Sequence, residues 1–390
     1  MSFYYTPDLC AGSFRAAALI QAMQSVLPAG SHIDVLTTLP NRYSSFNASA
    51  PEIEAGDTVA IRRIALPEHK SGMLDQSRAF IAYARGVRAH VRERKYDLVF
   101  ATSSRLMTAV LGASIARNRN LPLYLDIRDI FVDTIKDILP RWLAWPMGSV
   151  FSLLERYAVG HAGRVNLVSR GFEPYFSKRY PTKRLSFFTN GIDDEFIVKA
   201  QDDKPETKVV PPYSVLYAGN LGEGQGLHVI LPGLARAMNG QAKFTVIGDG
   251  GRKLQLKQAL DTAGVDNVSL VDPVNRSALV QAYQEADVLF LHLNDHDAFR
   301  KVLPSKVFEY AAVGKPVWAG VAGYAAEFIE AEIGNAAVFE PCDVASAVRA
   351  FSTLNIRATP RPDFIRKYAR RNIMQRLAED VVSFGLGRQL

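Results

Sequence analysis

At 390 residues the chain is too long for one ordinary hydrophobic core, so two domains are expected. A hydrophobic fraction of 48% and a charged fraction of 22% are typical of a soluble globular protein and exclude a disordered or fibrous chain. The net charge of +7 is uneven: residues 1–190 hold 24 Lys+Arg against 15 Asp+Glu, so the basic excess of the first half could face nucleic acid, anionic lipid or a phosphorylated substrate.

Short apolar strands alternate with helical segments in the first half. This alternation predicts parallel sheets with helices on both faces. Helices are expected at 14–25 and 77–94. The strands expected here are Phe3–Tyr5, His32–Thr37, Thr58–Ile64, Leu98–Ala101, Leu123–Asp126 and Arg164–Val168.

Two polar segments of the first half hold candidate binding residues. Gly12, Ser13 and Arg15 lie where the first strand turns into the first helix. Arg15 is either a cation that faces a bound anion or a surface arginine on an amphipathic helix. His69 and Lys70 lie in a polar loop and could contact an acceptor phosphate, although a lone loop histidine is more often merely exposed.

The strand at 123–126 ends in a cluster of charges that includes Asp126, Arg128 and Asp129. A carboxylate in a cleft can have its pKa raised enough to act as a general base. Asp129 is therefore the candidate for orienting or deprotonating an acceptor hydroxyl. The alternative is a structural Asp–Arg pair among the same residues.

Two first-half segments could lie on a membrane surface. Four basic residues between Arg85 and Lys95 recur on one helical face, although they fit a solvated face equally well. The segment Arg141–Tyr157 holds Trp142 and Trp145, is too short to span a bilayer, and is either an interfacial anchor or a buried helix.

Cellular location is constrained by two further features. Cys10 and Cys342 give no disulfide framework and favour a reducing cytoplasm. The sequence has no secretory signal pattern, and no uncharged apolar run reaches the roughly 18–20 residues that cross a bilayer. We therefore expect a cytoplasmic protein that binds the inner face of the cell membrane peripherally.

A polar, charged and proline-bearing segment at 193–212 predicts a linker between domains at 1–192 and 213–363. The final stretch, 364–390, is expected to be a helix that packs back on the first domain. A further helix is expected at 251–263. The second-half strands expected are Tyr213–Ala218, Lys243–Ile247, Val268–Val271, Val288–Leu293, Pro316–Ala319 and Ala337–Phe339.

Two glycine-rich turns follow strands of the second half. Gly219 and Asn220 begin the first turn, and Gly248 and Asp249 lie in the second. Glycines allow a phosphate to approach the backbone closely, and ligands of open parallel sheets bind outside the carboxyl ends of the strands. A tight turn without a ligand is the alternative for either turn alone. The sequence VIGDGG does not have the GxGxxG spacing of a dinucleotide-binding turn, which disfavours a dehydrogenase.

The segment Pro304–Gly320 carries the most specific motif, PSKVFEYAAVGKPVWAG. Pro304 and Ser305 suit a helix start, where backbone amides can hold phosphate. Lys306 adds a cation to that anion site, and the Glu309 carboxylate can accept both hydroxyls of a ribose. The motif therefore predicts binding of a nucleoside diphosphate.

A metal site is the rival interpretation of the preceding loop. Asp295-His296-Asp297 is formally a DxD motif, and His292 lies nearby. Such a motif can bind a divalent metal that bridges a diphosphate. A solvated loop is the more economical interpretation, so we expect no cofactor, no metal and activity that survives EDTA.

In their order along the chain these motifs resemble the donor-binding domain of retaining glycosyltransferases of family 4. The resemblance rests on VLYAGNLGEGQGL, VIGDGG, NVSLVDPVNRSALVQAYQEADVLFLHL and the PSK motif. SRGFEPYF with TNGIDDEFI resembles the interdomain segment, and YYTPDLCAGSFRAAAL the first loop of the acceptor domain. Among that family, bacterial O-antigen and capsule transferases of the N-acetylfucosaminyltransferase branch are the nearest in pattern.

The resemblance implies roles for individual residues. Glu309 matches the second glutamate of the family's pair, which holds the ribose, whereas Lys301 stands where the first glutamate would be. The first-loop residues would face the donor diphosphate, with Arg15 on the leaving group. The implied donor-binding set is Gly12, Ser13, Gly219, Asn220, Gly248, Asp249, Val274, Arg300, Lys301, Pro304, Ser305, Lys306 and Glu309, with Asp129, Arg15 and Lys306 catalytic and His69, Lys70 and Arg128 on the acceptor.

The sequence therefore predicts an α/β protein of the GT-B fold, with two Rossmann-like doubly wound domains facing a central cleft. The implied activity is metal-independent transfer, with retention, of an N-acetylated hexosamine or deoxyhexosamine from a UDP-sugar to a lipid-diphosphate-linked glycan in O-antigen or other surface polysaccharide biosynthesis. The implied partners are that donor, that acceptor and an anionic membrane surface, not nucleic acid. The alternatives are a nucleotide-sugar epimerase or hydrolase, or a non-catalytic basic protein that binds membrane or nucleic acid.

Overall fold

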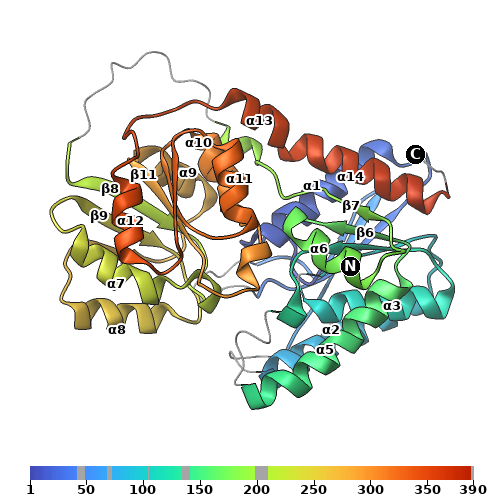
Figure 1. Cartoon of the computed structure of the whole chain (residues 1–390). Coiled ribbons are helices and arrows are strands. Elements are labelled where there is room, and N and C mark those ends of the chain that lie inside the picture. Colours follow the sequence, from blue (N-terminus) through green and yellow to red (C-terminus); the bar gives the residue numbers. More distant parts are fainter. Residues whose placement is uncertain (42–48, 68–72, 104, 134–140, 198–209, 388–390) are drawn as a thin grey trace. The chain divides into compact units, whose positions relative to one another are not determined.

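The computed structural model describes the chain except for residues 42–48, 68–72, 104, 134–140, 198–209 and 388–390 (Figure 1). The chain forms two compact units. Unit 1 comprises residues 1–190 and 371–390, and unit 2 comprises residues 191–370. Each unit is an α/β domain with a mainly parallel sheet.

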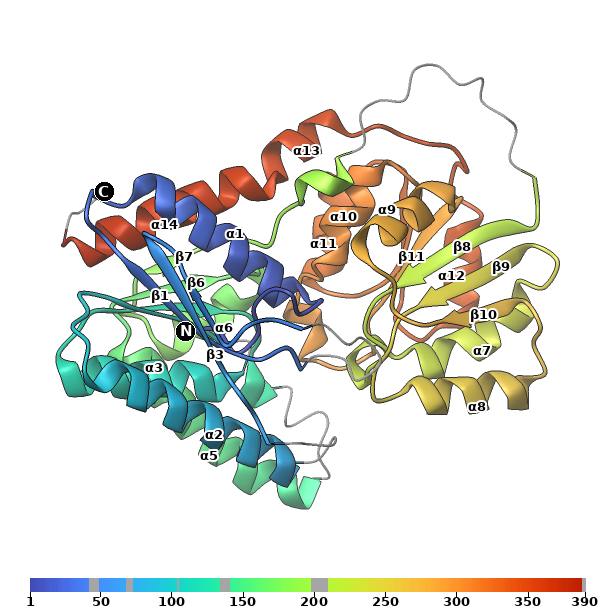
Figure 2. The same ribbon diagram turned by 180° about the vertical axis from the view of Figure 1, so that it is seen from behind.

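Unit 1 contains two short sheets, of order β1-β3-β2 and β4-β5-β6-β7, in which every pairing except β2 with β3 is parallel. Helices α2, α3 and α5 cover one face, and α1 and α14 the other (Figures 1 and 2). The elements are α1 (Ala11–Val26), β1 (Ile33–Thr38), β2 (Ile53–Ala55), β3 (Val59–Ile64), α2 (Met73–Arg92), β4 (Val99–Thr102), α3 (Leu106–Arg119), β5 (Leu123–Ile127), α5 (Arg141–His161), β6 (Arg164–Leu167), α6 (Glu173–Arg179), β7 (Leu185–Ser186) and α14 (Arg370–Gly385), whose first residue belongs to unit 2.

The first residues of the chain lie between the two sheets of unit 1. The backbone N–H of Ser2 donates to Leu36 O of β1 at 3.2 Å, and that of Thr102 of β4 donates to Met1 O at 3.1 Å. The expected strand Phe3–Tyr5 belongs to this connecting segment but is not a regular strand. The segment links the two sheets without a full ladder on either side.

Unit 2 contains a six-stranded, all-parallel sheet of order β10-β9-β8-β11-β12-β13. The chain starts in the middle at β8, moves outward to β10, and then returns to the other side of β8 at β11. The elements are β8 (Tyr213–Ala218), α7 (Leu227–Ala237), β9 (Ala242–Ile247), α8 (Lys253–Ala263), β10 (Val268–Val271), α9 (Arg276–Glu285), β11 (Val288–His292), α10 (Lys306–Val313), β12 (Val317–Gly320), α11 (Tyr324–Glu332), β13 (Ala336–Phe339), α12 (Val344–Phe351) and α13 (Pro362–Tyr368).

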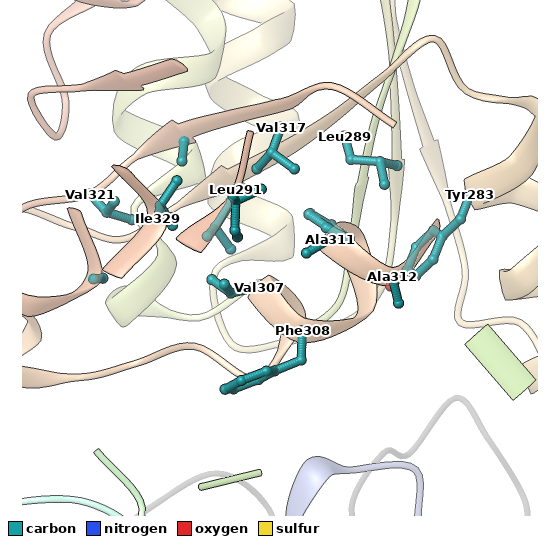
Figure 3. Close-up of a cluster of buried hydrophobic side chains, with 14 of the residues drawn as sticks. Tyr283, Leu289, Leu291, Val307, Phe308, Ala311, Ala312, Val317, Val321 and Ile329 are labelled. Carbon is teal, nitrogen blue, oxygen red and sulfur yellow. The ribbon is translucent and has the colours of Figure 1, made fainter. Parts of the chain in front are cut away.

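Strand β11 is buried on both faces, which explains its unbroken apolar sequence. Leu289 and Leu291 pack in one core cluster with residues of α9, α10 and α11, as Figure 3 shows. Val288 and Phe290 pack in a second cluster with residues of α7, α8 and α12. Alternating side chains of one strand therefore fix helices on both faces of the sheet, and so hold α10 behind β11.

The expected linker and final helix need correction. The linker was expected to begin at 193, but Phe196 is fully buried in the core of unit 2, so this segment is part of that unit. The expected helix at 364–390 is two helices, α13 and α14, separated at Ala369. Ala369 is extended because it forms a parallel bridge with Ile192, whose N–H donates to Tyr368 O at 2.8 Å.

Candidate functional site

The candidate site of unit 2 lies where the order of its strands reverses. Strands β8 and β11 are neighbours, but the chain leaves them toward opposite edges of the sheet. The connections that follow their carboxyl ends therefore diverge, and in open parallel sheets ligands bind at such a reversal. The turn at Gly219 follows β8, and the loop before α10 follows β11.

The two glycine turns lie against each other at this point. Gly219 has a φ of +143°, and a Cβ built on Gly248 would lie only 1.8 Å from Gly219 O. The N–H of Leu221 also donates to Asp249 O at 2.8 Å. The structure thus brings together the predicted residues Gly219, Asn220, Gly248 and Asp249, through a backbone contact that only glycine permits.

The first glycine turn is held in place by hydrogen bonds. The Asn220 amide donates to Gln225 Oε1 at 2.8 Å within the turn. The N–H of Asn294, just after β11, donates to Gly224 O at 2.9 Å, and His292 Nδ1 lies 2.7 Å from Gln225 O. These bonds join the turn after β8 to the end of β11, and so fix its backbone before any ligand binds.

Lys306 begins α10 and reaches across to the first glycine turn. Its Nζ lies 3.3 Å from Tyr217 Oη and 4.6 Å from the centre of the Tyr217 ring, and a Cβ built on Gly219 would lie 2.0 Å from it. Burial lowers the pKa of Lys306 to about 8, with the Glu309 charge opposing the shift. The residue is thus a partly desolvated cation beside the glycine turn that follows β8.

Glu309 lies one helical turn after Lys306 and belongs to a network of charged and phenolic groups. Tyr283 Oη donates to Glu309 Oε2 at 3.1 Å. Burial raises the pKa of Glu309, while the charges of Arg276 and Arg370 and the Tyr283 hydrogen bond lower it and the charge of Asp193 raises it. Arg370 Nε lies 2.7 Å from Asp193 Oδ1, and Arg276 also pairs with Asp193.

The segment 295–301 has a different environment from the one that the sequence predicts. Arg300, expected at the diphosphate, lies half exposed and pairs with Asp295 at 3.1 Å and Asp297 at 3.7 Å. Lys301 follows it in a short 3-10 helix. The two carboxylates of the DxD motif therefore balance Arg300, which reduces the charge that this segment can offer to a diphosphate.

His292 does not complete a metal site with the DxD motif. It is fully buried, its Nε2 accepts from Cys342 N–H at 3.0 Å, and its Nδ1 faces Gln225 O. Burial lowers its pKa to about 4, so the ring is neutral and both nitrogens serve the backbone. Within the described part of the chain, no three or more His, Cys, Asp or Glu residues are grouped to hold a metal ion.

The structure corrects the predicted role of Arg15 in unit 1. Arg15 is 2% exposed, and its guanidinium donates twice to the Asp126 carboxylate, at 3.0 and 2.9 Å. The same group donates to Phe188 O at 2.8 Å and Thr189 O at 2.5 Å. A cation used in this way joins α1 to β5 and the segment after β7, and is not available to a donor diphosphate.

Asp126 is the anionic half of this buried pair. Burial would raise its pKa, but the charge and hydrogen bonds of Arg15, the charge of Arg128 and a hydrogen bond from Asn166 lower it overall. The structural Asp–Arg pair considered for this strand end is thus present, with Arg15 as its cation. Ser13 needs the same correction: it is fully buried and its hydroxyl donates to backbone carbonyls of the turn, Asp8 and Cys10.

Of the charged residues predicted at the end of β5, Arg128 and Asp129 are more accessible than the buried Asp126. Asp129 is exposed beyond β5, and its charge acts on Arg128. Arg128 is half-buried; burial lowers its pKa, and its Nε would lie 3.8 Å from a Cβ on Gly12. Gly12, Arg128 and Asp129 therefore lie near one another and stay candidates. His69 and Lys70 lie outside the described residues.

Several residues that shape the unit 2 site escaped prediction. Tyr217 lies under Lys306, Tyr283 bonds Glu309, and Arg276 acts on Glu309 from the start of α9. The sequence did contain a signal that places Arg276 at a helix start. It follows Asn275, whose side chain accepts a hydrogen bond from Ala278 N–H and so caps α9. The remaining predicted residues are half-buried at the helix start or beside the core, namely Val274, Pro304 and Ser305.

Two helices on one face of unit 1 (Figures 1 and 2) carry exposed basic and apolar side chains. Arg85, Arg88 and Arg92 of α2 are exposed. On α5, Trp145 is 81% and Leu153 65% exposed. No helix among the described residues is both long and apolar enough to cross a membrane.

Both halves of the chain match family models. Residues 13–191 match the model described as "Glycosyl transferase 4-like domain", and residues 198–371 match "Glycosyl transferases group 1". The chain belongs to the GT-B glycosyltransferases. The glycosyltransferase is 24% identical over 236 residues to WcaI of Escherichia coli (strain K12), named for colanic acid biosynthesis, and the match spans 57% of each protein.

Solved structures confirm the GT-B fold. Sucrose-phosphate synthase from Thermosynechococcus elongatus superimposes with a TM-score of 0.67 at 14% identity, over 96% of this glycosyltransferase and 91% of that chain. WaaG, a glycosyltransferase involved in lipopolysaccharide biosynthesis, gives 0.62 at 15% identity over 99% and 97%.

Proposed function

We propose that this glycosyltransferase transfers a sugar from a UDP-sugar to a lipid-diphosphate-linked glycan during surface polysaccharide synthesis, with retention of anomeric configuration. One observation carries the proposal. The Lys306 ammonium lies beside the Gly219 turn, one helical turn from Glu309, at the reversal of strand order in unit 2. A cation, open backbone and a carboxylate at this spacing suit a diphosphate followed by a ribose.

In this proposal the diphosphate is the leaving group. Catalysis consists mainly of stabilising the negative charge that develops on it. Lys306 and the amides of the glycine turns stabilise that charge, and they are in place before the reaction begins. Glu309 binds the ribose hydroxyls and so fixes the donor. We assign no covalent nucleophile; attack from the face of the departing diphosphate retains the configuration. Asp129 and Arg128 of unit 1 are proposed for the acceptor.

The substrate class rests on the relatives and on chemistry. WcaI is named for colanic acid biosynthesis, and WaaG is described as involved in lipopolysaccharide biosynthesis. Both names point to cell-surface polysaccharides, and a lipid-diphosphate-linked glycan is the acceptor that we propose. An N-acetylated hexosamine or deoxyhexosamine is the proposed sugar.

A thermal-shift screen tests the donor class. The full chain is heated with UDP, GDP or ADP and with their sugars, each in excess Mg²⁺ and in EDTA. We expect UDP to raise the melting temperature most, since a ligand that binds only the folded protein stabilises it by mass action, and the shift to persist in EDTA. If no nucleotide raised the melting temperature, the proposal would be contradicted. Sugar release without acceptor would favour the hydrolase alternative.

Donor affinity should depend on pH through Lys306. With its pKa near 8 in the free protein, Lys306 loses its charge as the pH rises above 8, so UDP affinity should fall by up to about tenfold per pH unit there. A Lys306→Arg variant keeps its charge over that range. Calorimetric titration at pH 7 to 9.5 should show the fall in the natural chain and not in this variant; an equal fall in both would remove Lys306 as its cause.

Peripheral membrane binding is proposed through α2 and α5. The exposed arginines of α2 would attract anionic lipid, and Trp145 and Leu153 of α5 would enter its interface. We expect a Trp145→Ser, Leu153→Ser double variant to lose sedimentation with vesicles that contain phosphatidylglycerol. The control is Leu254→Ser, a 69% exposed leucine of unit 2. Unchanged sedimentation of the double variant would exclude α5 as the anchor.

A further inference from the structure

A buried tyrosine lies beside Glu309, the residue that the proposed function places on the ribose. Tyr283 belongs to α9, is 1% exposed, and its ring lies against α10 (Figure 3). Its hydroxyl donates to Glu309 Oε2 at 3.1 Å, whereas Glu309 itself is only half-buried. The phenol therefore meets the carboxylate from the protein side and leaves its outer side to a ligand.

The Tyr283 ring is held by two other buried rings. Phe196 stacks on it with ring centres 5.5 Å apart, and Tyr310 meets it edge-on at 5.2 Å. Both neighbours are fully buried, and the Tyr310 hydroxyl accepts from Ala218 N–H, at the end of β8, at 3.2 Å. Because these contacts fix the ring, they also fix the position of the Tyr283 hydroxyl relative to α10.

This hydroxyl removes a freedom that the Glu309 carboxylate would otherwise have. The terminal torsion of a glutamate is broad, so a carboxylate without a partner can turn about it. An ionised carboxylate offers about four acceptor positions, of which Tyr283 takes one and the two hydroxyls of a ribose would take two more. A carboxylate that is already held by one bond loses less entropy when the ribose binds.

The phenol also affects the charge of Glu309. Burial raises the pKa of Glu309, and the charges of Arg276 and Arg370 lower it. Both arginines also pair with Asp193, whose charge raises the pKa of Glu309. The Tyr283 hydrogen bond lowers this pKa, so the hydroxyl favours the ionised carboxylate, which is the form that accepts two hydroxyl protons.

We propose that Tyr283 is a positioning residue of the nucleotide site: its hydroxyl holds Glu309 Oε2, presents the carboxylate to both ribose hydroxyls, and so makes the site selective for ribonucleotides. Tyr283 acts through Glu309 and does not itself touch the nucleotide. The inference rests on the proposed function, because it takes Glu309 as the group that binds the ribose. It goes beyond that function by assigning the selectivity to a residue of α9, outside the PSK motif.

The test compares two nucleotides that differ only at the ribose, UDP and 2′,3′-dideoxy-UDP, by titration calorimetry with the full chain. The natural chain should bind UDP about 10- to 100-fold more tightly, because the dideoxy nucleotide has no hydroxyls for Glu309. Tyr283→Phe keeps the ring and its stacking. It should weaken UDP binding about five- to tenfold and leave the affinity for 2′,3′-dideoxy-UDP within about twofold.

The ratio of the two affinities adds a pH readout that a purely structural role would not move. The phosphates are the same in both nucleotides, so their titration cancels in the ratio. The ratio should fall at acid pH as Glu309 gains a proton, and in Tyr283→Phe the fall should begin at a higher pH, because the bond that lowers this pKa is lost. The other charged groups that act on Glu309 are the same in both proteins, namely Lys306, Arg276, Arg370 and Asp193.

Two further variants complete the test. The control is Tyr213→Phe, at the start of β8, where the tyrosine ring packs against Phe351; both affinities should stay unchanged. Glu309→Gln should abolish the selectivity for UDP, which checks the ribose role of Glu309 independently of Tyr283.

Three outcomes would overturn the inference. An equal loss of affinity for both nucleotides in Tyr283→Phe would mean that the tyrosine only supports the fold. Loss of selectivity in Glu309→Gln but not in Tyr283→Phe would leave the proposed function standing and remove the role of Tyr283. Equal affinity of the natural chain for the two nucleotides would instead remove the ribose role of Glu309 from the proposed function, and the inference with it.

Discussion

Replacing Arg15 with alanine is expected to destabilise unit 1 by about 3–5 kcal/mol, because it leaves the buried Asp126 carboxylate without its main counter-charge. The carbonyls of Phe188 and Thr189 would also lose their donors. The loss of stability is measured as a decrease in the melting temperature of unit 1, taken from its thermal unfolding transition. UDP binding at a temperature where the variant is folded should be unchanged, since Arg15 is not placed on the donor.

A matched control separates burial from charge in this experiment. Arg366 and Asp363 form an exposed pair at 2.6 Å, with side chains 77% and 86% exposed. Arg366→Ala should cost about 1 kcal/mol or less, because solvent screens such a pair. If Arg15→Ala were as mild as this control but lowered UDP affinity, the role that the sequence predicted for Arg15 would be right and the structural role wrong.

The second large effect is expected at Lys306. Lys306→Ala should weaken UDP binding by about 10- to 100-fold, the size expected for the loss of a charge-assisted bond to the diphosphate. Turnover of the sugar donor should fall further, by about 10²- to 10³-fold, because charge on the leaving group grows in the transition state. Titration calorimetry with UDP and initial rates with the donor found by the thermal-shift screen measure both effects.

Two further variants test whether the effect of Lys306→Ala is specific to this position. Lys367→Ala is the control: this lysine pairs with Glu332 at 2.6 Å on the surface of unit 2 and should leave UDP affinity unchanged. Gly219→Ala should resemble Lys306→Ala, since the new Cβ would lie only 2.0 Å from Lys306 Nζ and displace it. An Lys306→Ala variant with unchanged UDP affinity would remove the diphosphate role of this lysine.

Sequence patterns predicted the buried strands well, because their apolar runs are set by burial on both faces. Strand β8 begins and ends at the predicted residues, and the other second-half strands agree within one or two. The strands that escaped prediction, β2 and β7, have three and two residues, and β2 is exposed throughout. Such short edge strands depend on their neighbours and leave little pattern in the sequence.

The residues of the candidate site also differ in how far local sequence could predict them. Lys306 and Glu309 lie on one turn of α10, so their proximity follows from local sequence, and the structure adds Tyr217 and Tyr283 from elsewhere in the chain. The pairing of Arg15 with Asp126 joins residues 111 positions apart. No local pattern distinguishes that buried pair from a surface arginine, which is why its role needed correction.

Hydrogen–deuterium exchange of the full chain with and without UDP tests the central claim most directly, because it locates the nucleotide without knowledge of the sugar or the acceptor. We expect slower exchange in UDP at the glycine turn after β8, residues 217–226, and at the start of α10, residues 304–309. Lys306→Ala should reduce that protection, and Lys367→Ala should not. Protection confined to unit 1, or no protection at saturating UDP, would contradict the assignment of the donor site to unit 2.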